Sequence, residues 1–206
     1  MLRRAAQWPA RFGRVALPRG RALWGAILYG LLAIGTTYAF VYWGLVRVPA
    51  VLSAPLLALV PLMTLFFTRA HGLEELRGRA VAGTLIATAG VFIGLAGGLG
   101  SAVHVPVVLA FVVGVAFLAE AGVVFKLFPK GHPLAANAVA FTMGTPILIV
   151  LSRLTGEQWS LPSTAGTWAA FGYLVLIGSV VQFYLYVYVL SRWTASATAY
   201  SFLLVP

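Results

Sequence analysis

Seven long apolar runs constrain the fold of this chain more than any other feature of its sequence. Six of them contain no charged residue, and the remaining one, at about 104–126, contains a single glutamate. A helix needs about 20 residues to cross the hydrocarbon core of a bilayer, and every run except the last is near that length. The runs lie at roughly 23–45, 50–68, 80–99, 104–126, 133–152, 167–189 and 194–206. We therefore expect an all-α integral membrane protein, built as a bundle of about seven transmembrane helices.

The overall composition excludes a water-soluble globular protein. Hydrophobic residues make up 61% of the chain and charged residues only 9%, against about 25% charged residues in ordinary soluble domains. The mean hydropathy is +0.97, whereas a soluble protein must present polar groups to water. A transmembrane β-barrel is excluded as well, because its strands alternate polar with apolar residues and these runs are continuously apolar.

The basic residues are divided unequally between the segments that connect the runs. If these segments alternate between the two sides of the membrane, one side receives only Arg47 and Arg153. The other side receives twelve basic residues: Arg3, Arg4, Arg11, Arg14, Arg19, Arg21, Arg69, Arg77, Arg79, Lys126, Lys130 and Arg192. Cytoplasmic segments of membrane proteins carry an excess of lysine and arginine. The distribution therefore predicts a multi-pass protein of the inner (cytoplasmic) membrane whose basic arm, residues 1–22, is cytoplasmic.

The net charge of +10 fits this orientation better than it fits nucleic-acid binding. The positive charges are spread over short loops, where they suit anionic lipid head groups, and no soluble domain presents them as one patch. The sequence has no cysteine, and its histidines, His71, His104 and His132, all fall between the runs. It also lacks a Walker glycine loop and the G-x-S-x-G and H-E-x-x-H motifs. We expect no nucleic-acid partner, no metal, no cofactor and no enzymatic activity.

The chain contains two copies of one hydrophobic segment. Residues 194–206 repeat residues 49–61, with Ser53 aligned to Thr198 and with the identical pairs Ala50/Ala195, Ala54/Ala199, Leu59/Leu204, Val60/Val205 and Pro61/Pro206. Upstream, after a two-residue slip, the match resumes with the pairs Gly35/Gly178, Thr36/Ser179, Phe40/Phe183 and Trp43/Tyr186. A membrane chain with an internal repeat is most often a carrier whose related halves enclose a central site.

Several segments resemble the EamA-type domain of the drug/metabolite transporter superfamily. In the first half these are PRGR (18–21), YAFVYWGL (38–45), ALVPL (58–62) and GTLIATAGV (83–91). The second half, from FKLFPKGHPLAANAVAFTMG onward, resembles the opening of a second such domain. The resemblance implies ten helices in two inverted five-helix repeats, of which this chain would hold the third to the ninth, the last one shortened. Residues 23–99 would be the latter part of the first repeat, and 104–206 the first part of the second.

Polar side chains recur on one face of the two helices that the repeat makes equivalent. Thr36, Ala39 and Trp43 share a face of the first helix, and their counterparts Ser179, Gln182 and Tyr186 share a face of the second. Polar side chains that faced lipid would have no hydrogen-bond partners, so we expect this stripe to point inward. For Trp43 and Gln182, a place in a solute cavity and a contact between helices remain equal alternatives.

Three further polar residues are assigned to the same cavity. Ser53 and Thr198 occupy equivalent positions of the repeat, and we expect both to line it. Asn137, early in the run at 133–152, would either line the cytoplasmic mouth of the cavity or bond a neighbouring backbone group.

Glu120 is the one acidic residue inside an apolar run, about six residues from its cytoplasmic end. An ionised carboxylate at this depth is costly and usually marks a position that binds a proton, an ion or a cation. The alternative is a structural role, in which Glu120 pairs with Lys126 or reaches the cytoplasmic interface.

Glycines and alanines on the run at 80–99 predict a close helix contact. They recur at spacings of three and four and so share one face: Gly83, Ala87, Gly90, Gly94 and Gly98. Small residues at this spacing let two helices approach closely. We expect a static packing contact on this face rather than a sliding interface.

Two prolines occupy equivalent positions within the repeated runs. Pro61 and Pro206 each remove one backbone hydrogen bond and favour a kink. The two kinks would be either the hinges of a gate or static bends.

These observations together predict a secondary carrier that moves a small organic solute outward by alternating access, driven by a proton or substrate gradient. One alternative is a scaffold or degenerate fragment that does not transport. A less favoured alternative is a membrane enzyme acting on lipid-linked substrates, which would normally gather several carboxylates or histidines at one membrane face. The expected partners are a small-molecule substrate and the lipid bilayer, and a homodimer is left open.

Overall fold

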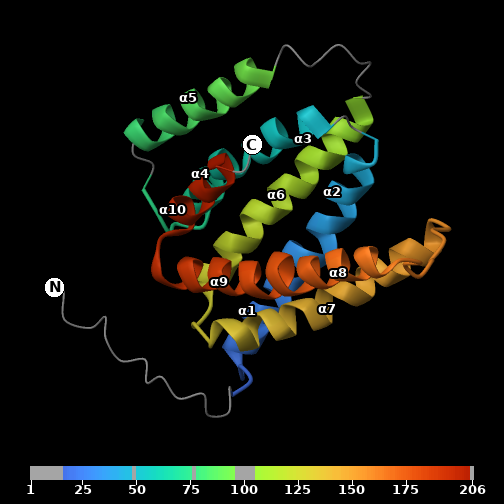
Figure 1. Ribbon diagram of the computed structural model, residues 1–206. Helices are drawn as coiled ribbons and strands as arrows, with labels where there is room; N and C mark the ends of the chain where they lie inside the picture. Colours follow the sequence, from blue (N-terminus) through green and yellow to red (C-terminus); the bar gives the residue numbers. More distant parts are fainter. Residues whose placement is uncertain (1–15, 48–49, 76–77, 96–104, 205–206) are drawn as a thin grey trace.

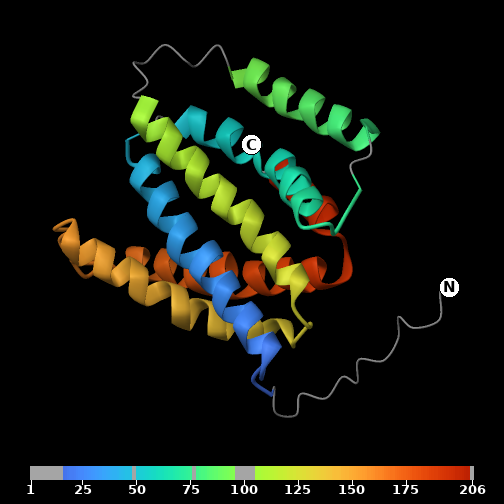
Figure 2. The same ribbon diagram turned by 180° about the vertical axis from the view of Figure 1, so that it is seen from behind.

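The computed structural model describes residues 16–47, 50–75, 78–95 and 105–204. Throughout these ranges the regular structure is helical and no strand occurs, which confirms the all-α class. Long helices cross one another at steep angles, as the two opposite views in Figures 1 and 2 show. The arrangement is that of a membrane bundle.

Four helices are long and apolar enough to cross a membrane within the described ranges. The first is continuous through α1 (Arg21–Gly30), η1 (Leu31–Thr36) and α2 (Thr37–Leu45). Two are single α-helices, α6 (Val105–Leu127) and α7 (Pro133–Leu154). The fourth is continuous through α8 (Ala165–Tyr173), η3 (Leu174–Val181) and α9 (Gln182–Arg192). All four lie within a few residues of the apolar runs predicted from the sequence.

The run predicted at 50–68 forms two helices instead of one. It divides into α3 (Ala50–Leu57) and α4 (Val60–Ala70), with a break at Ala58 and Leu59. Pro61 lies in the first turn of α4, just beyond this break, where its missing N–H needs no partner. Pro206, its counterpart, lies outside the described residues.

A further helix and a final broken segment complete the fold. These are α5 (Gly78–Leu95), then α10 (Ala195–Ala199) and the 3₁₀ segment η4 (Tyr200–Leu204). The Thr88 hydroxyl of α5 donates to the Ala58 carbonyl at 3.2 Å, so it satisfies an acceptor freed by the break between α3 and α4. The Thr84 hydroxyl, one turn earlier, lies 2.8 Å from the hydroxyl of Tyr200 in η4. One face of α5 therefore supports both irregular segments.

The small-residue face predicted on α5 is not the face that carries Thr84 and Thr88. A Cβ atom added at Gly83 or Gly90 would meet no other atom within 4 Å, so the described part of the chain places no helix against these two positions. Gly98 and the surroundings of Ala87 and Gly94 lie outside what the structure describes. A contact on this face stays a prediction.

The helix formed by α1, η1 and α2 runs parallel to α7 and in close contact with it. Gly30 packs against the backbone of Ala140 and Gly35 against Ile147, both in α7, and Gly25 packs against Phe128 in the segment just before α7. A Cβ at Gly30 would lie 2.4 Å from the Ala140 Cα, so this approach requires glycine. Lipid tails are as apolar as the side chains, and such close dispersion contacts are therefore what holds membrane helices together.

The described basic residues are divided between the two ends of the bundle, as the sequence predicted. Lys126 at the end of α6 donates to the Trp193 carbonyl, and Glu74 in the loop after α4 accepts from Ser196 of α10. These contacts bring the loops onto one end of the bundle, the basic end, whose described basic residues are Arg19, Arg21, Arg69, Arg79, Lys126, Lys130 and Arg192. Arg47 and Arg153 end two parallel helices at the opposite end, the far end.

The two copies of the repeat run in opposite directions. The helix of α1, η1 and α2 leaves the basic end, whereas the helix of α8, η3 and α9 returns to it (Figure 1). Even so, the π-helical segments η1 and η3 begin 143 positions apart, the same offset as the Gly35/Gly178 match. The helices α3 and α10 begin 145 positions apart, at the matched residues Ala50 and Ala195.

Side-chain hydrogen bonds reproduce this equivalence. The Thr36 hydroxyl donates to the Leu31 carbonyl at 3.0 Å, and the Ser179 hydroxyl donates to the Leu174 carbonyl at 3.4 Å. Both bonds reach back five residues, across the widened turn that defines a π-helix. The same hydroxyl thus supports the same irregular turn in two oppositely directed copies.

Alanine substitutions at two glycines test the packing of α1 against α7. Gly30→Ala should lower the free energy of unfolding by about 1–3 kcal/mol, because the new Cβ overlaps the Ala140 backbone. Gly83→Ala, at an open helical position, should be neutral or stabilising, since alanine is the better helix former. Thermal unfolding of the two purified variants measures the difference. Equal melting temperatures would contradict the close packing described here.

Candidate functional site

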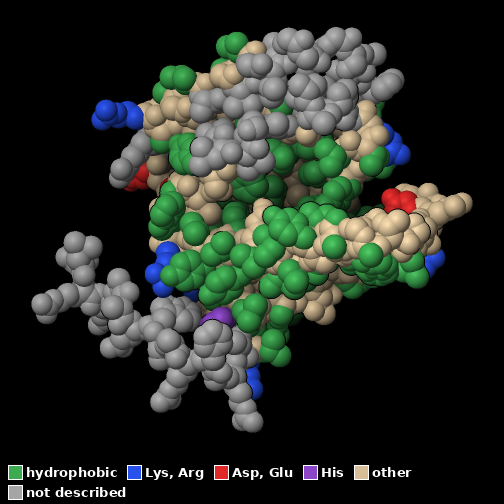
Figure 3. All heavy atoms as spheres, viewed as in Figure 1, with side chains coloured by type: hydrophobic (Ala, Val, Ile, Leu, Met, Phe, Trp, Pro, Cys, Tyr) green, Lys and Arg blue, Asp and Glu red, His purple; other side chains and the backbone are tan. Residues whose placement is uncertain are grey.

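A cavity of about 880 Å³ lies between the two copies of the repeat. Figure 3 shows this face of the molecule hollowed between the row formed by α8 and α9 and the elements above it. One wall comes from α1, η1 and α2, with Tyr29, Ala33, Thr37, Tyr38, Val41 and Tyr42. The facing wall comes from α9, with Gln182, Phe183, Leu185, Tyr186 and Val189.

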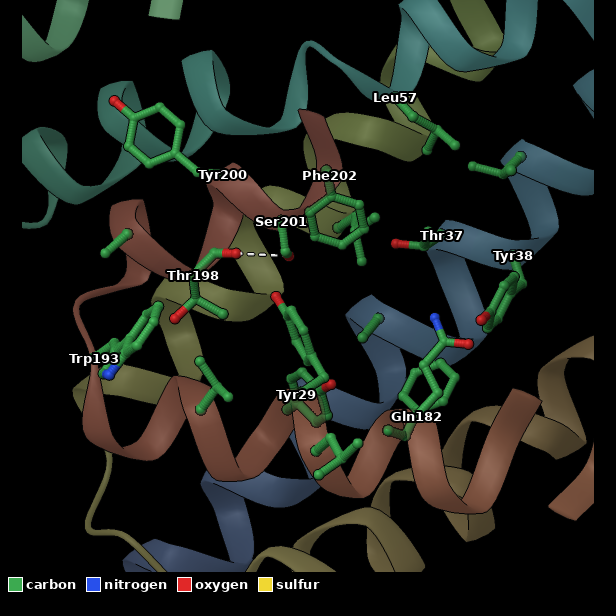
Figure 4. Close-up of a pocket in the computed structure, with 18 of the residues that line it drawn as sticks. Tyr29, Thr37, Tyr38, Leu57, Gln182, Trp193, Thr198, Tyr200, Ser201 and Phe202 are labelled. Atoms are coloured by element: carbon green, nitrogen blue, oxygen red, sulfur yellow. Dashed lines mark hydrogen bonds between the residues drawn. The ribbon is translucent and has the colours of Figure 1, made fainter. Parts of the chain in front are cut away.

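The remaining walls come from the irregular segments. The turn between α9 and α10, α10 itself and η4 contribute Trp193, Ala197, Thr198, Tyr200, Ser201 and Phe202, and Leu57 and Leu118 complete the described lining. In Figure 4, Gln182 points from α9 toward Thr37 and Tyr38 on the opposite helix. Side chains from both oppositely directed copies therefore line the same cavity.

Aromatic rings make up much of the described lining. Tyr38 stacks on Tyr42 with ring centroids 5.1 Å apart and makes a tilted contact with Phe183 at 6.4 Å. Tyr186 meets Phe202 edge to face at 6.0 Å. These ring contacts join the two copies and η4 across the cavity, and they give it stiff, flat walls.

Several hydroxyl groups of the lining are already engaged with the protein. Thr37 donates to the Leu32 carbonyl at 2.8 Å, and Thr198 donates to the Thr194 carbonyl at 2.9 Å. Ser201 donates to the Thr198 carbonyl, and the Tyr200 hydroxyl is held by Thr84 of α5. These hydroxyl groups therefore bond to protein groups and do not offer their hydrogens to a solute in the cavity.

Other polar groups of the lining make no hydrogen bond to any described residue. These are the phenol hydroxyls of Tyr29, Tyr38, Tyr42 and Tyr186, the side-chain amide of Gln182 and the indole N–H of Trp193. None of the described lining residues carries a formal charge. The cavity thus offers neutral hydrogen-bonding groups between aromatic walls.

The structure brings three of the predicted site residues into this cavity: Gln182, Tyr186 and Thr198. Trp43 is not among the lining residues, because its ring turns to the far end, where the Arg47 guanidinium lies 4.6 Å from the ring centroid. Thr36 and Ser179 also lie outside the lining and support the π-helical turns instead.

Ser53 and Asn137 also lie outside the described lining of the cavity. Ser53 is partly buried in α3, outside the described lining, and it makes an interaction of its own. Asn137 is 6% exposed in α7, also outside the lining, and neither polar atom of its side chain has a hydrogen-bond partner within the described ranges. The cavity role predicted for these two residues stays a prediction.

Glu120 pairs with a residue that the sequence did not suggest. Its Oε1 atom lies 2.6 Å from His71 Nε2, in the turn that ends α4, and its Oε2 atom is buried without a partner among the described residues. Lys126 instead donates to the Trp193 carbonyl. Glu120 therefore links α6 to α4 near the basic end, beside the cavity rather than in its described lining.

The loop after α4 also holds the start of α10. The Glu74 carboxylate accepts from the Ser196 backbone N–H at 3.3 Å and from the Ser196 hydroxyl. Glu74, Glu75, Thr194 and Ser196, with Leu65 and Ala80, line a second, smaller cavity of about 420 Å³ at the basic end.

Comparison with known proteins gives a family match over most of the chain. The model of the EamA-like transporter family matches residues 8–95 and 105–206. The chain is 31% identical over 191 residues to the uncharacterized inner membrane transporter YedA of Escherichia coli strain K12, with the same figures for the proteins of strains O6:H1 and O157:H7. The alignment covers 90% of this chain and 61% of these relatives. No solved structure matches it significantly.

Proposed function

Since the chain belongs to the EamA-like transporter family, we propose that it acts as a secondary carrier that exports a small organic solute by alternating access. The observation that carries this proposal is the cavity between two oppositely directed copies of one helical unit. Inverted repeats give a carrier two related conformations, because rocking one copy against the other moves the opening from one side to the other.

The cavity has the size and the walls that such a role needs. Small-molecule sites usually enclose about 300–1,000 Å³ and combine apolar walls with a few polar groups. The wall from α1, η1 and α2 and the wall from α9 touch mainly through rings, such as the contact of Tyr38 with Phe183. Ring contacts of this kind separate at a lower cost than buried ion pairs, which suits two walls that must move apart.

The basic end would face the cytoplasm, in keeping with the excess of positive residues on cytoplasmic segments. At the far end, Arg47 and Arg153 each lie over a tryptophan ring, Trp43 and Trp159, at 4.6 and 4.3 Å from the ring centroids. Tryptophan rings of this kind anchor helix ends at the membrane surface.

Paired substitutions distinguish the cavity wall from the membrane anchor. Gln182→Leu should lower kcat/KM for the transported solute about tenfold, because the amide is a polar group of the lining without a partner among the described residues. Trp43→Leu should leave kcat/KM within about twofold, because its ring lies outside the described lining. Counterflow of a metabolite panel into proteoliposomes measures both. Equal losses, or no transport of any metabolite by the parent protein, would contradict the proposal.

Glu120 and His71 would couple transport to the proton gradient. The carboxylate is the one acidic group inside an apolar run, and one of its oxygens is buried without a partner among the described residues. A carboxylate in this setting can gain and lose a proton as the surrounding helices move. The contact with His71 ties that event to α4, which continues from the broken segment beside the cavity.

Removal of the Glu120 charge tests this coupling. Glu120→Gln should abolish the dependence of transport on the proton gradient while leaving expression intact. Glu157→Gln, in the exposed loop after α7, is the matched control and should keep that dependence. Transport assayed with and without a pH gradient gives the comparison. An unchanged gradient dependence in Glu120→Gln would remove Glu120 from the mechanism.

A further inference from the structure

We propose that the cavity selects uncharged solutes that combine a flat ring with a hydrogen-bond acceptor such as an amide or ketone carbonyl. This inference rests on the proposed function, because it names the class of solute for the same cavity. It comes from three properties of the described lining: the absence of charge, the aromatic walls and the free polar groups.

The electrostatics of the lining disfavour an ion. No described lining residue is charged, and the charged groups around it are engaged elsewhere. The Glu120 carboxylate pairs with His71, and the Lys126 ammonium donates to the Trp193 carbonyl. A solute ion in the cavity would lose its hydration without gaining a counter-charge, which is unfavourable at membrane depth.

The shape of the lining favours a ring. Tyr38 and Tyr42 form a stacked pair on one wall, and Tyr186 and Phe202 form an edge-to-face pair on another. Aromatic rings prefer stacked or edge-to-face neighbours at centroid distances of about 4.5–7 Å. A planar solute can take the place of such a neighbour, whereas a bulky aliphatic group fits flat walls poorly.

The free polar groups favour an acceptor on the solute. The phenol hydroxyls of Tyr29, Tyr38 and Tyr186 and the amide of Gln182 make no hydrogen bond to a described residue, and all four side chains reach the cavity. The Thr and Ser hydroxyls of the lining already donate to backbone carbonyls. The cavity therefore offers phenol and amide groups, which can donate as well as accept, and the indole N–H of Trp193, which can only donate. Donors are in excess, and a carbonyl oxygen is a neutral group that accepts from them.

Three probes of similar size test the charge preference. Phenylacetamide, phenylacetate and 2-phenylethylammonium share one ring and chain length, and they are neutral, anionic and cationic at pH 7. Ligand-observed NMR on the full chain in nanodiscs, with empty nanodiscs subtracted, gives a dissociation constant for each. We expect phenylacetamide to bind at least tenfold more tightly than either ion. Tighter or equal binding of the cation would show that the tyrosines form a cation–π cage and would overturn the inference, as would equal binding of the anion or no binding of the amide.

Two further comparisons test the ring and the donors. Cyclohexylacetamide should bind several-fold more weakly than phenylacetamide, and equal affinity would contradict the role of the aromatic walls. Tyr186→Phe removes a hydroxyl of the cavity and should weaken phenylacetamide binding about threefold or more. Tyr184→Phe, on the same helix but outside the described lining, is its matched control and should not. Binding in nanodiscs requires no transport, so a carrier that fails in proteoliposomes yet binds the amide would refute the proposed function and leave this inference standing.

Discussion

The structure depends on one constraint, that a polar backbone group inside a bilayer must find its partner within the protein. Most of the chain meets it with unbroken helices. Where the helices depart from regular geometry, a side chain supplies the missing bond: Thr88 reaches the free carbonyl of Ala58 at the break between α3 and α4. Hydroxyls at Thr36 and Ser179 bond across the two π-helical turns. Side-chain hydroxyls thus stabilise the irregular segments of the helices.

The first transmembrane helix is closely packed on one side and lines the cavity on the other. The helix of α1, η1 and α2 meets α7 through glycines, where no room is left even for a Cβ at Gly30. Its other side carries Tyr29 and Tyr38 and faces the returning helix across the cavity. One side of the helix is therefore packed closely against its neighbour, while the other contacts its counterpart through aromatic rings.

The sequence allowed much of the fold to be predicted, because hydrophobic run length and charge distribution act locally. The long spans, the separation of Arg47 and Arg153 from the other described basic residues, and the repeat offsets all have direct structural counterparts. Gln182 could be predicted as a polar residue on an inward stripe, since the repeat singled it out. The partner of Glu120 could not be predicted, because His71 lies 49 positions away and only the packing of α4 on α6 brings the two together.

The described lining of the first helix differs from the polar stripe predicted on it. Regular α-helical spacing and side-chain polarity predict that Thr36 and Trp43 lie on the inward face. Ala33 in η1 and Thr37 and Val41 in α2, spaced by four, line the cavity instead, beside Tyr38 and Tyr42. Arg47, four residues after Trp43, was the available sign that this tryptophan belongs to the membrane surface.

Cross-linking in native membranes tests most directly the claim that two oppositely directed copies face each other across the cavity. The chain has no cysteine, so introduced pairs report without background. The account predicts that a flexible bis-maleimide, which bridges thiols too far apart for a direct disulfide, joins Tyr38→Cys to Phe183→Cys, whose native rings are in contact. It should not join Trp43→Cys to Tyr186→Cys. A cross-link in the second pair without one in the first would contradict the account.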